Sequence, residues 1–416
     1  SSGSGAISFG STLYGAQTLA VNTSGATTFT GAVGGTAALT SLTTDAGGTV
    51  AINGGVVNTT GAQIYGEAAT LGAATVLPST GSGAITLANT LNGAQTLVVN
   101  TSGVTTYTGA VGSSTALTSL TTDGGTAGSV AINGGVVNTT GAQSYGESAT
   151  LGADNVITST GAGAITFGNT LDGARNLTLN TAGVTTFNGK VGDGTALTSL
   201  TTNTGGSVVI NGGLIKTTGA QTINKAITLG EETVLRGMNV ALMSTVDGAQ
   251  ALTIYDSGTT VLGGNIGSVT PLMSLATDSF TTAAGETHFK GASIHTTTDA
   301  VFNDIVKIFN DVRVTAAGQL TFAKTIDGDT AGTRSLILDG GNIAAINVDG
   351  AVGETNPLKT LEVVNSEFTT FTGPVTTETS VVLSDTQHTI AFYGGLTTPT
   401  LTVAAEAFNL TLRANV

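Results

Sequence analysis

The stretch INGGVVNTTGAQ, residues 52–63, decides the fold. It recurs without change at residues 132–143 and with three changes at residues 210–221. A copy kept through an otherwise low-complexity sequence indicates one structural unit written several times. Internal repetition therefore overrides the two or three globular domains that a chain of 416 residues would ordinarily suggest.

The length of the repeat follows from a glycine that comes directly after Leu-Tyr, Leu-Asn, Leu-Asp, Val-Asp or Ile-Asp. The spacing of this glycine gives a repeat of about 80 residues. It predicts three close solenoid repeats, at about residues 1–80, 81–160 and 161–240, and divergent repeats that continue the same rod over residues 241–416. The marker glycines are Gly15, Gly93, Gly173, Gly248 and Gly328.

Short apolar alternations broken by Gly, Asn, Asp and Ser predict strands and turns throughout. No window of eleven or more residues in the first three repeats sustains helical periodicity. Each repeat divides into about four uneven sub-repeats of about 20 residues, a length that suits one coil of a parallel β-helix. Three longer coils per repeat are an alternative. A string of Ig-like sandwiches fits less well, because Trp is absent and the repeats abut without linkers.

Composition narrows the classes of partner. The formal net charge is −14, and no Lys or Arg precedes Arg175, so the surface cannot neutralise the phosphates of nucleic acid or of anionic membranes. Cysteine is absent, which excludes disulfides and thiolate metal sites and suits a secreted protein. No apolar run approaches the roughly 18–20 residues that span a bilayer, so we expect no membrane insertion in this segment.

Both ends of the chain fall within a repeat. Residues 1–7 enter at the same phase as residues 79–85, and residues 409–412 resemble residues 176–179. We therefore expect a mature portion or a fragment of a longer protein, whose signal peptide and secretion domain lie outside this segment.

Several short stretches resemble a known family. They are GAITF (163–167), NLTLN (176–180), TTFNG (185–189) and LTSLTT (197–202). The resemblance covers residues 1–240 well and residues 241–416 in phase only. They are similar to the repeats of very large Gram-negative surface proteins of the filamentous-haemagglutinin and autotransporter-adhesin type. The resemblance implies an all-β fold, a right-handed parallel β-helix (β-solenoid), exported through the outer membrane and displayed as a fibre. The family has no shared catalytic residues.

The function expected from these observations is that of an extracellular structural protein at the cell surface of a Gram-negative bacterium. It would be a rod segment of a larger adhesin, or of a filament that assembles a matrix or biofilm. The partners would be further copies of the chain, end to end or side by side, or host and cell-surface glycans or proteins. We expect no enzyme, no cofactor, and no catalytic, cofactor-binding or metal-binding residues.

Three motifs suggest other readings. The sequence LPSTG at residues 77–81 is the same as a sortase anchoring signal. A working signal is followed by an apolar span and a basic tail, whereas this one lies inside a repeat. The histidines are His288, His295 and His388; the first two are seven residues apart, not at a chelating spacing, and neither of these two has an obvious acidic partner at a fixed offset. Asp-Gly steps hint at calcium, although Asp-Gly is a common turn dipeptide; they begin at Asp172, Asp247, Asp327, Asp339 and Asp349.

Two alternative functions stay open. A carbohydrate-active enzyme needs convergent carboxylates, whereas the six acidic residues before Arg175 are scattered. In the second half, cations could gather with acids at Arg236, Lys290, Lys307, Arg313, Lys324 and Arg334. An ice-binding or glycan-binding module needs the Thr-rich strands at residues 27–30, 105–108 and 185–188 to align on one flat face. The copy is lost after Gln221, and a stretch with Lys and Phe follows Gly237, which suggests specific contacts there.

Overall fold

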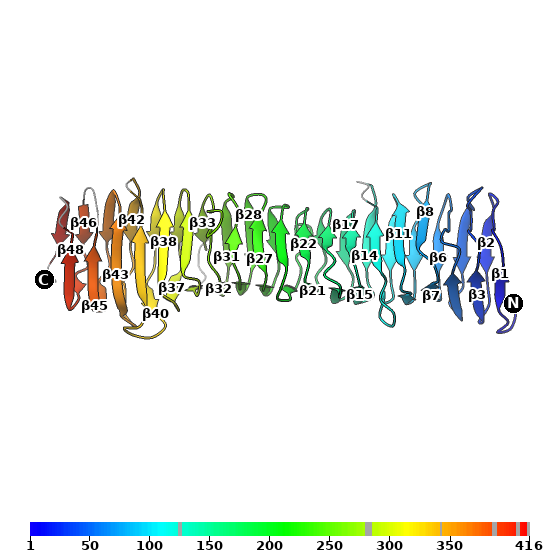
Figure 1. The fold of residues 1–416 in the computed structure, drawn as a ribbon, viewed down its shortest axis with the longest axis horizontal. Helices are drawn as coiled ribbons and strands as arrows, with labels where there is room; N and C mark the ends of the chain where they lie inside the picture. Colours follow the sequence, from blue (N-terminus) through cyan, green and yellow to red (C-terminus); the bar gives the residue numbers. More distant parts are fainter. Residues whose placement is uncertain (124–126, 279–284, 342, 385–388, 405–407, 414–416) are drawn as a thin grey trace. The chain divides into compact units, whose positions relative to one another are not determined.

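The computed structural model describes residues 1–123, 127–278, 285–341, 343–384, 389–404 and 408–413. Over these residues the chain is all-β and contains no helix. Within each of its two units the parallel strands form a right-handed β-solenoid, which confirms the predicted fold class (Figure 1). The chain divides into two compact units, Ser1–Gly212 and Gly213–Val416.

Unit 1 is a coil with three strands per turn, so its strands stack into three faces. Isolated bridges at Val111 extend face A, and bridges at Leu13, Val33 and Val57 begin face B. Face A holds β1 (Ile7–Phe9), β3 (Ala26–Phe29), β5 (Thr49–Ile52), β7 (Ala68–Leu71), β10 (Leu91–Asn92), β15 (Val136–Thr139), β18 (Asn155–Ser159), β21 (Asn176–Thr181) and β23 (Ser199–Thr202). Face B holds β8 (Thr75–Ser79), β11 (Thr96–Thr101), β13 (Ser119–Thr122), β16 (Gln143–Tyr145), β19 (Ile165–Phe167), β22 (Val184–Phe187) and β24 (Ser207–Ile210). Face C holds β2 (Thr18–Val21), β4 (Ser41–Thr44), β6 (Gln63–Tyr65), β9 (Ile85–Leu87), β12 (Val104–Tyr107), β14 (Ser129–Ile132), β17 (Ser148–Leu151) and β20 (Leu171–Asp172).

Unit 2 has the same three-sided construction. Strand β45 bends from one face to the next, since its start pairs with β47 and its end with β48. Face D holds β26 (Gln221–Ile223), β29 (Val240–Leu242), β32 (Thr259–Leu262), β34 (Glu286–Phe289), β37 (Ile305–Ile308), β40 (Ile326–Gly328) and β47 (Leu396–Thr397). Face E holds β27 (Ala226–Leu229), β30 (Val246–Asp247), β35 (Ser293–Thr296), β38 (Val312–Ala316), β41 (Ser335–Asp339), β43 (Leu358–Asn365), β45 (Val375–Leu383) and β48 (Thr400–Val403). Face F holds β25 (Leu214–Lys216), β28 (Thr233–Gly237), β31 (Leu252–Asp256), β33 (Leu275–Thr277), β36 (Ala300–Phe302), β39 (Leu320–Phe322), β42 (Ala345–Val348), β44 (Phe368–Phe371), β46 (Thr389–Phe392) and β49 (Asn409–Leu412).

The core is the narrow interior of the coil. Side chains alternate inward and outward along each strand, and equivalent inward positions stack from coil to coil. On face B the buried rings of Tyr145, Phe167 and Phe187 stack with centroids 5.1 and 5.7 Å apart. Small and β-branched residues fill most other inward positions, as the low aromatic content predicts.

The sequence repeat does not contain a whole number of turns. Strand pairing links residues 20, 23, 19 and 22 positions apart from Ile7 to Leu91, so the predicted coil length of about 20 is confirmed. The first repeat runs from Ile7 on face A to its equivalent Ile85 on face C, and the second runs on to Ile165 on face B. Each repeat therefore spans eleven strand positions, or three and two-thirds turns. The estimate of four coils per repeat was slightly too high.

Glycine is required where one coil turns closely over the next. Gly34 and Gly112 occupy equivalent corners with φ of 69° and 68°, a region that L side chains rarely adopt. A Cβ at either position would collide with the carbonyl oxygen of the next coil, from Asn58 or Asn138. These glycines are therefore kept for backbone geometry.

Removal of one whole repeat should leave the fold intact. Deletion of residues 85–164 joins Ala84 to Ile165, the equivalent of Ile85, and every later contact is preserved in kind. We expect an unchanged β-sheet circular dichroism spectrum and a Tm within about 5 °C of the parent.

The matched control deletes one further residue, Ile165. It puts Thr166 at the inward position and turns Phe167 outward in the joined strand, so it should melt well below the 80-residue deletion. Equal melting temperatures for the two deletions would contradict the stacking described above.

Candidate functional site

The copied stretch forms most of one turn and ends in a buried glutamine. In the first copy it runs from β5 to β6, and Gln63 is fully buried. The Gln63 Nε2 donates to the carbonyl oxygens of Val57, at 2.9 Å, and Pro78, at 2.8 Å. The Tyr65 hydroxyl donates to the Gln63 Oε1 at 2.9 Å. The glutamine thus satisfies backbone groups of two adjacent coils, which explains why the stretch is repeated.

The other two copies show the same arrangement and its erosion. Gln143 Nε2 donates to Thr158 O at 2.8 Å, and Tyr145 donates its hydroxyl to Gln143 Oε1 at 2.8 Å. In the third copy Gln221 keeps its Nε2 bonds, but Ile223 replaces the tyrosine and leaves the buried Gln221 Oε1 without a partner. The copied stretch is therefore a structural element.

Two acidic pairs in unit 1 were missed by the sequence reasoning. Glu67 and Glu147 follow the tyrosines by two residues, and each is only 1% exposed. Asp45 and Asp123 approach these glutamates from the preceding coil. Burial raises the pKa of both glutamates, and the neighbouring aspartate of each raises it further; the pKa of Glu147 reaches about 7. Four of the six acidic residues before Arg175 therefore form pairs, which corrects the prediction that they are scattered. The signal in the sequence that could have revealed the two pairs is that they occupy equivalent positions in two repeats.

Unit 2 carries a related row of buried carboxylates. Asp256 accepts hydrogen bonds from the backbone N–H groups of Asn239 and Val240, each at 2.7 Å. Asp278 Oδ1 accepts from Asp256 N at 2.6 Å, while its buried Oδ2 has no partner. Burial and the carboxylates of Asp304 and Asp256 raise the pKa of Asp278 to about 7.

The Asp-Gly steps are mostly turn caps, as the common role of this dipeptide predicts. Asp172 Oδ1 accepts from the N–H groups of Gly194 and Thr195, both at 2.9 Å, on the next coil. Asp247 and Asp327 each cap two N–H groups in the same way. Asp339 differs, since it accepts from Gly341 N and pairs with an arginine. Asp349 lies exposed after β42.

The Thr-rich strands do not share a face. Strand β3 lies on face A, β12 on face C and β22 on face B, because the repeat is one-third of a turn short of four coils. Thr27, Thr105 and Thr185 point inward and are fully buried. This arrangement does not form the single flat hydroxyl array that an ice-binding or glycan-binding face needs.

The sortase-like letters lie within a strand. Residues 77–79 of this motif belong to β8, and Leu77 is fully buried in the core. The motif is thus part of the coil.

The histidines are dispersed, but one has an acidic partner. The side chains of Glu286 and His288 on β34, and of Lys290 directly after it, alternate outward. His288 Nε2 lies 2.8 Å from Glu286 Oε2, so the prediction that this histidine lacks an acidic partner was wrong. His295 is exposed on β35, and His388 lies outside the described residues. The spacing of two residues was the signal that could have identified this partner, because residues two apart in a strand lie on the same face.

The cations of the second half do not all gather around one site, although Arg313 and Arg334 both belong to the site described below. Lys290 lies 5.1 Å over the Phe309 ring, and Lys307 pairs with Glu286 at 2.7 Å. Arg236 lies 4.8 Å over the Tyr255 ring. Lys324 is exposed between β39 and β40.

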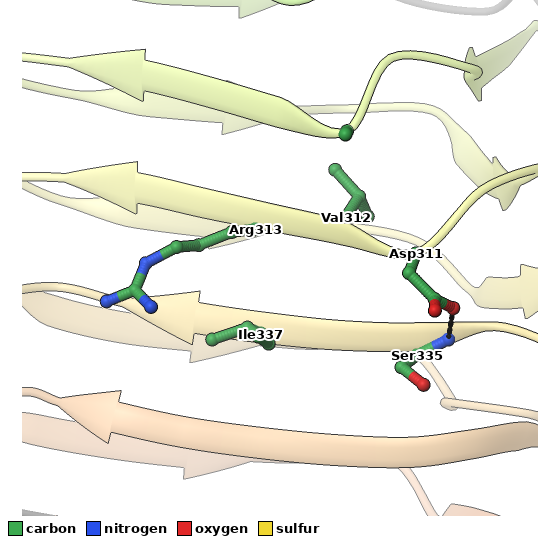
Figure 2. Close-up of a pocket in the computed structure, with 6 residues that line it drawn as sticks. Asp311, Val312, Arg313, Ser335 and Ile337 are labelled. Carbon is green, nitrogen blue, oxygen red and sulfur yellow. Dashed lines mark hydrogen bonds between the residues drawn. The ribbon is translucent and has the colours of Figure 1, made fainter.

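A shallow hollow of about 220 Å³ opens on face E between β38 and β41 (Figure 2). Asp311 holds one end, where its Oδ1 accepts from Ser335 N at 2.8 Å. Arg313 projects along the other end and pairs with Asp339 at 2.5 Å. The lining consists of Ala292, Asp311, Val312, Arg313, Ser335 and Ile337.

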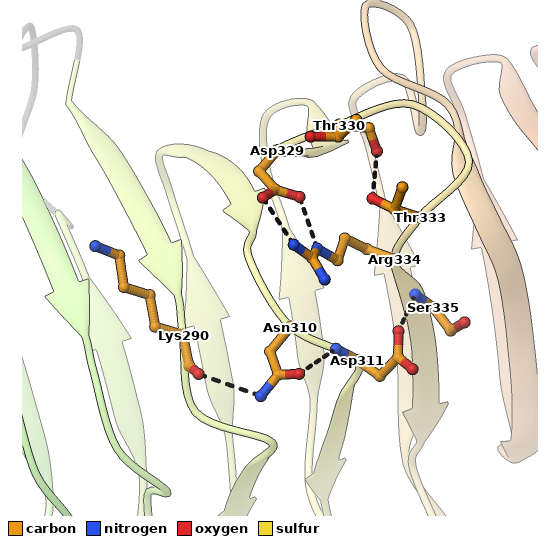
Figure 3. Close-up of polar contacts among 8 residues, drawn as sticks. All are labelled: Lys290, Asn310, Asp311, Asp329, Thr330, Thr333, Arg334 and Ser335. Carbon is orange, nitrogen blue, oxygen red and sulfur yellow. Dashed lines mark hydrogen bonds and ion pairs between the residues drawn. The ribbon is translucent and has the colours of Figure 1, made fainter.

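A loop between β40 and β41 stands beside the hollow (Figure 3). Within it the Arg334 guanidinium donates to both oxygens of Asp329, at 2.7 and 2.9 Å, and Thr333 Oγ1 donates to Thr330 O at 2.8 Å. The two charges neutralise each other and hold the loop in one conformation. We call the hollow and this loop the face E site; both lie in the divergent repeats, after Gly237.

The buried glutamine network predicts opposite effects for two tyrosines. Tyr145→Phe leaves the Gln143 oxygen unpaired and should cost about 1–2 kcal/mol of unfolding free energy. Tyr107→Phe is the matched control, because the buried Tyr107 hydroxyl has no partner and Phe29 and Phe187 occupy the equivalent position. Denaturant unfolding should show it neutral or stabilising, and equal losses for both variants would contradict the network.

Asp278 should make stability depend on pH. Its folded pKa of about 7 exceeds the ordinary value of 3.8. The contribution of Asp278 to the unfolding free energy is therefore fully present below about pH 4 and is lost as the pH rises through 7. Asp278→Asn keeps the acceptor for Asp256 N, as Asn203 does for Thr181 N, and removes the charge. At pH 8 it should stabilise by about 1–2 kcal/mol, and at pH 4 by much less. A Tm gain that is the same at both pH values would contradict the assignment.

The described residues contain no group of three or more His, Cys, Asp or Glu arranged to hold a metal ion. The same ranges include no helix that is long and apolar enough to cross a membrane. Comparison of the chain with protein-family models, with curated proteins and with solved structures finds no match.

Proposed function

We propose that this chain is a structural segment of an extracellular surface fibre, which mediates adhesion or assembles into a filament or matrix. The observation that carries the proposal is the phase of the repeat. Equivalent strands of successive repeats lie on faces A, C and B, so repetition builds no common ligand-binding face. What every repeat does preserve is the packing of one coil on the next. Repetition of packing without repetition of a surface favours a stiff spacer.

Specific contacts of such a segment are best sought at the face E site. Exposed polar and charged groups there surround a hollow large enough for a side chain or a sugar ring. Arg313 is fixed by Asp339, and Arg334 is fixed by Asp329, so these groups are preorganised for hydrogen bonding. A protein or glycan surface is the partner that this arrangement supports.

The face E site gives little support to the alternative function, that of a carbohydrate-active enzyme. Glycoside hydrolysis uses two carboxylates that flank the scissile bond, and among the described residues Asp311 is the single acidic one that lines the hollow. Its Oδ1 is already engaged by Ser335 N. The hollow therefore suits binding better than bond cleavage.

The spacer role is tested by lengthening the chain. Five additional copies of residues 85–164, inserted in tandem into the native protein, should separate its ends by roughly 90 Å more, at about 4.8 Å per coil. Immunogold electron microscopy with tags at both ends of the chain, on intact cells that produce it, measures this separation. Five copies of residues 85–165 are the control, because each breaks the inward pattern by one residue.

The expected result is extracellular label whose separation grows with the number of copies, with attachment to the target surface retained. Label confined to the cell interior, or an unchanged separation with loss of attachment, would contradict the proposal.

A further inference from the structure

The strongest unexplained feature of unit 1 is the acidic pair at the corner after β6. Neither carboxylate oxygen of Glu67 has a hydrogen-bond partner, although the residue is 1% exposed. Asp45, one coil earlier, is partly exposed and is held at the corner by a 3.2 Å bond from Thr23 N to its Oδ1. A buried carboxylate without hydrogen bonds is costly unless it is neutralised.

The same corner recurs in the second repeat, on a different edge of the coil. Both oxygens of Glu147 are buried without partners, and so is Asp123 Oδ1. Asp123 lies against Glu147 and is partly exposed to solvent. Two independent copies of one arrangement show that the pair belongs to the design of the repeat.

A buried hydroxyl accompanies each pair. Thr27 is fully buried, its Oγ1 has no hydrogen-bond partner, and it lies against Glu67. Thr105 is its equivalent in the second repeat, with the same burial and the same unpaired Oγ1. The first corner thus combines two carboxylates and a hydroxyl, all of them oxygen ligands, and the second corner has the equivalent residues of its own repeat. Neither set includes His or Cys.

The third repeat replaces the pair by a cation of its own. Lys225 stands at the sequence position of Glu67 and Asn203 at that of Asp45, and Lys225 is also 1% exposed. Thr185, the equivalent of Thr27, still has an unpaired hydroxyl, so the change concerns the charges. Where the chain supplies a buried positive charge, it dispenses with both carboxylates.

We propose that the corners Asp45–Glu67 and Asp123–Glu147 each bind one hard divalent cation of the calcium class, with Thr27 and Thr105 as additional oxygen ligands. Calcium accepts irregular shells of carboxylate, hydroxyl, carbonyl and water oxygens, whereas magnesium requires a near-ideal octahedron. Two carboxylates balance one divalent charge. The partly exposed aspartates give the ion a route from solvent.

The test uses the full chain, freed of metal with a chelator and desalted at pH 8. Calcium chloride is titrated calorimetrically, and thermal melts are recorded with and without millimolar calcium. The wild type should bind two equivalents and gain roughly 2–5 °C in Tm. Glu67→Gln/Glu147→Gln should lose both effects, and the exposed pair Glu231→Gln/Glu232→Gln is the matched control that keeps them.

The variant Glu67→Lys/Glu147→Lys copies the third repeat and should melt independently of calcium. If the glutamine variant does not give the wild-type β spectrum, Asp45→Asn/Asp123→Asn carries the same test. An equal Tm gain in wild type and glutamine variant would show weak surface binding only and overturn the proposal. It would equally be overturned if calcium leaves the wild type unchanged while the glutamine variant melts higher, since the corners would then hold protons.

Discussion

The structure depends on the burial of one coil by the next. Each turn of about 20 residues is too small to enclose a core, and its inward side chains are covered only because parallel strands stack above and below it. The strand pairing between coils also satisfies the backbone N–H and C=O groups that a lone turn would leave unpaired. Glycines such as Gly34, the capping oxygens of Asp172 and Asp247, and the glutamine at position 63 all serve this contact between coils.

This dependence explains how the repeat can occupy a fractional number of turns. The packing of a solenoid coil depends on its two neighbours and not on whether an equivalent coil lies directly above it. A repeat of eleven strands therefore packs as well as one of nine or twelve. The consequence falls on the surface: residues that are equivalent in sequence are carried to a different face by each repeat. Features shared by all repeats therefore serve packing, and features that occur once, such as the face E site, are the ones available for recognition.

Much of the fold could be predicted from the sequence, because its causes are local. Alternation, turn residues and the spacing of the glycine marker indicate strands, corners and repeat length. The fractional turn could not be predicted, since the isolated bridges of face B at Leu13, Val33 and Val57 are too short to be recognised as strands in the sequence. Glu67 and Glu147 were missed because a charged residue after a turn glycine ordinarily faces solvent. The pairing of Glu286 with His288 could not be predicted, because a shared strand face brings two side chains near each other without fixing the rotamers that let them meet.

The most direct test of the stacking of coils across a repeat boundary is a pair of engineered cysteines in a chain that has no native cysteine. Val76 of the first repeat stacks on Val98 of the second, and Val98 stacks in turn on Thr121. Coils that stack across the repeat boundary predict disulfide formation for V76C/V98C as readily as for V98C/T121C, and none for V76C/T121C, two coils apart. A V98C/T121C disulfide without its V76C/V98C counterpart would show that the repeats fold as separate domains.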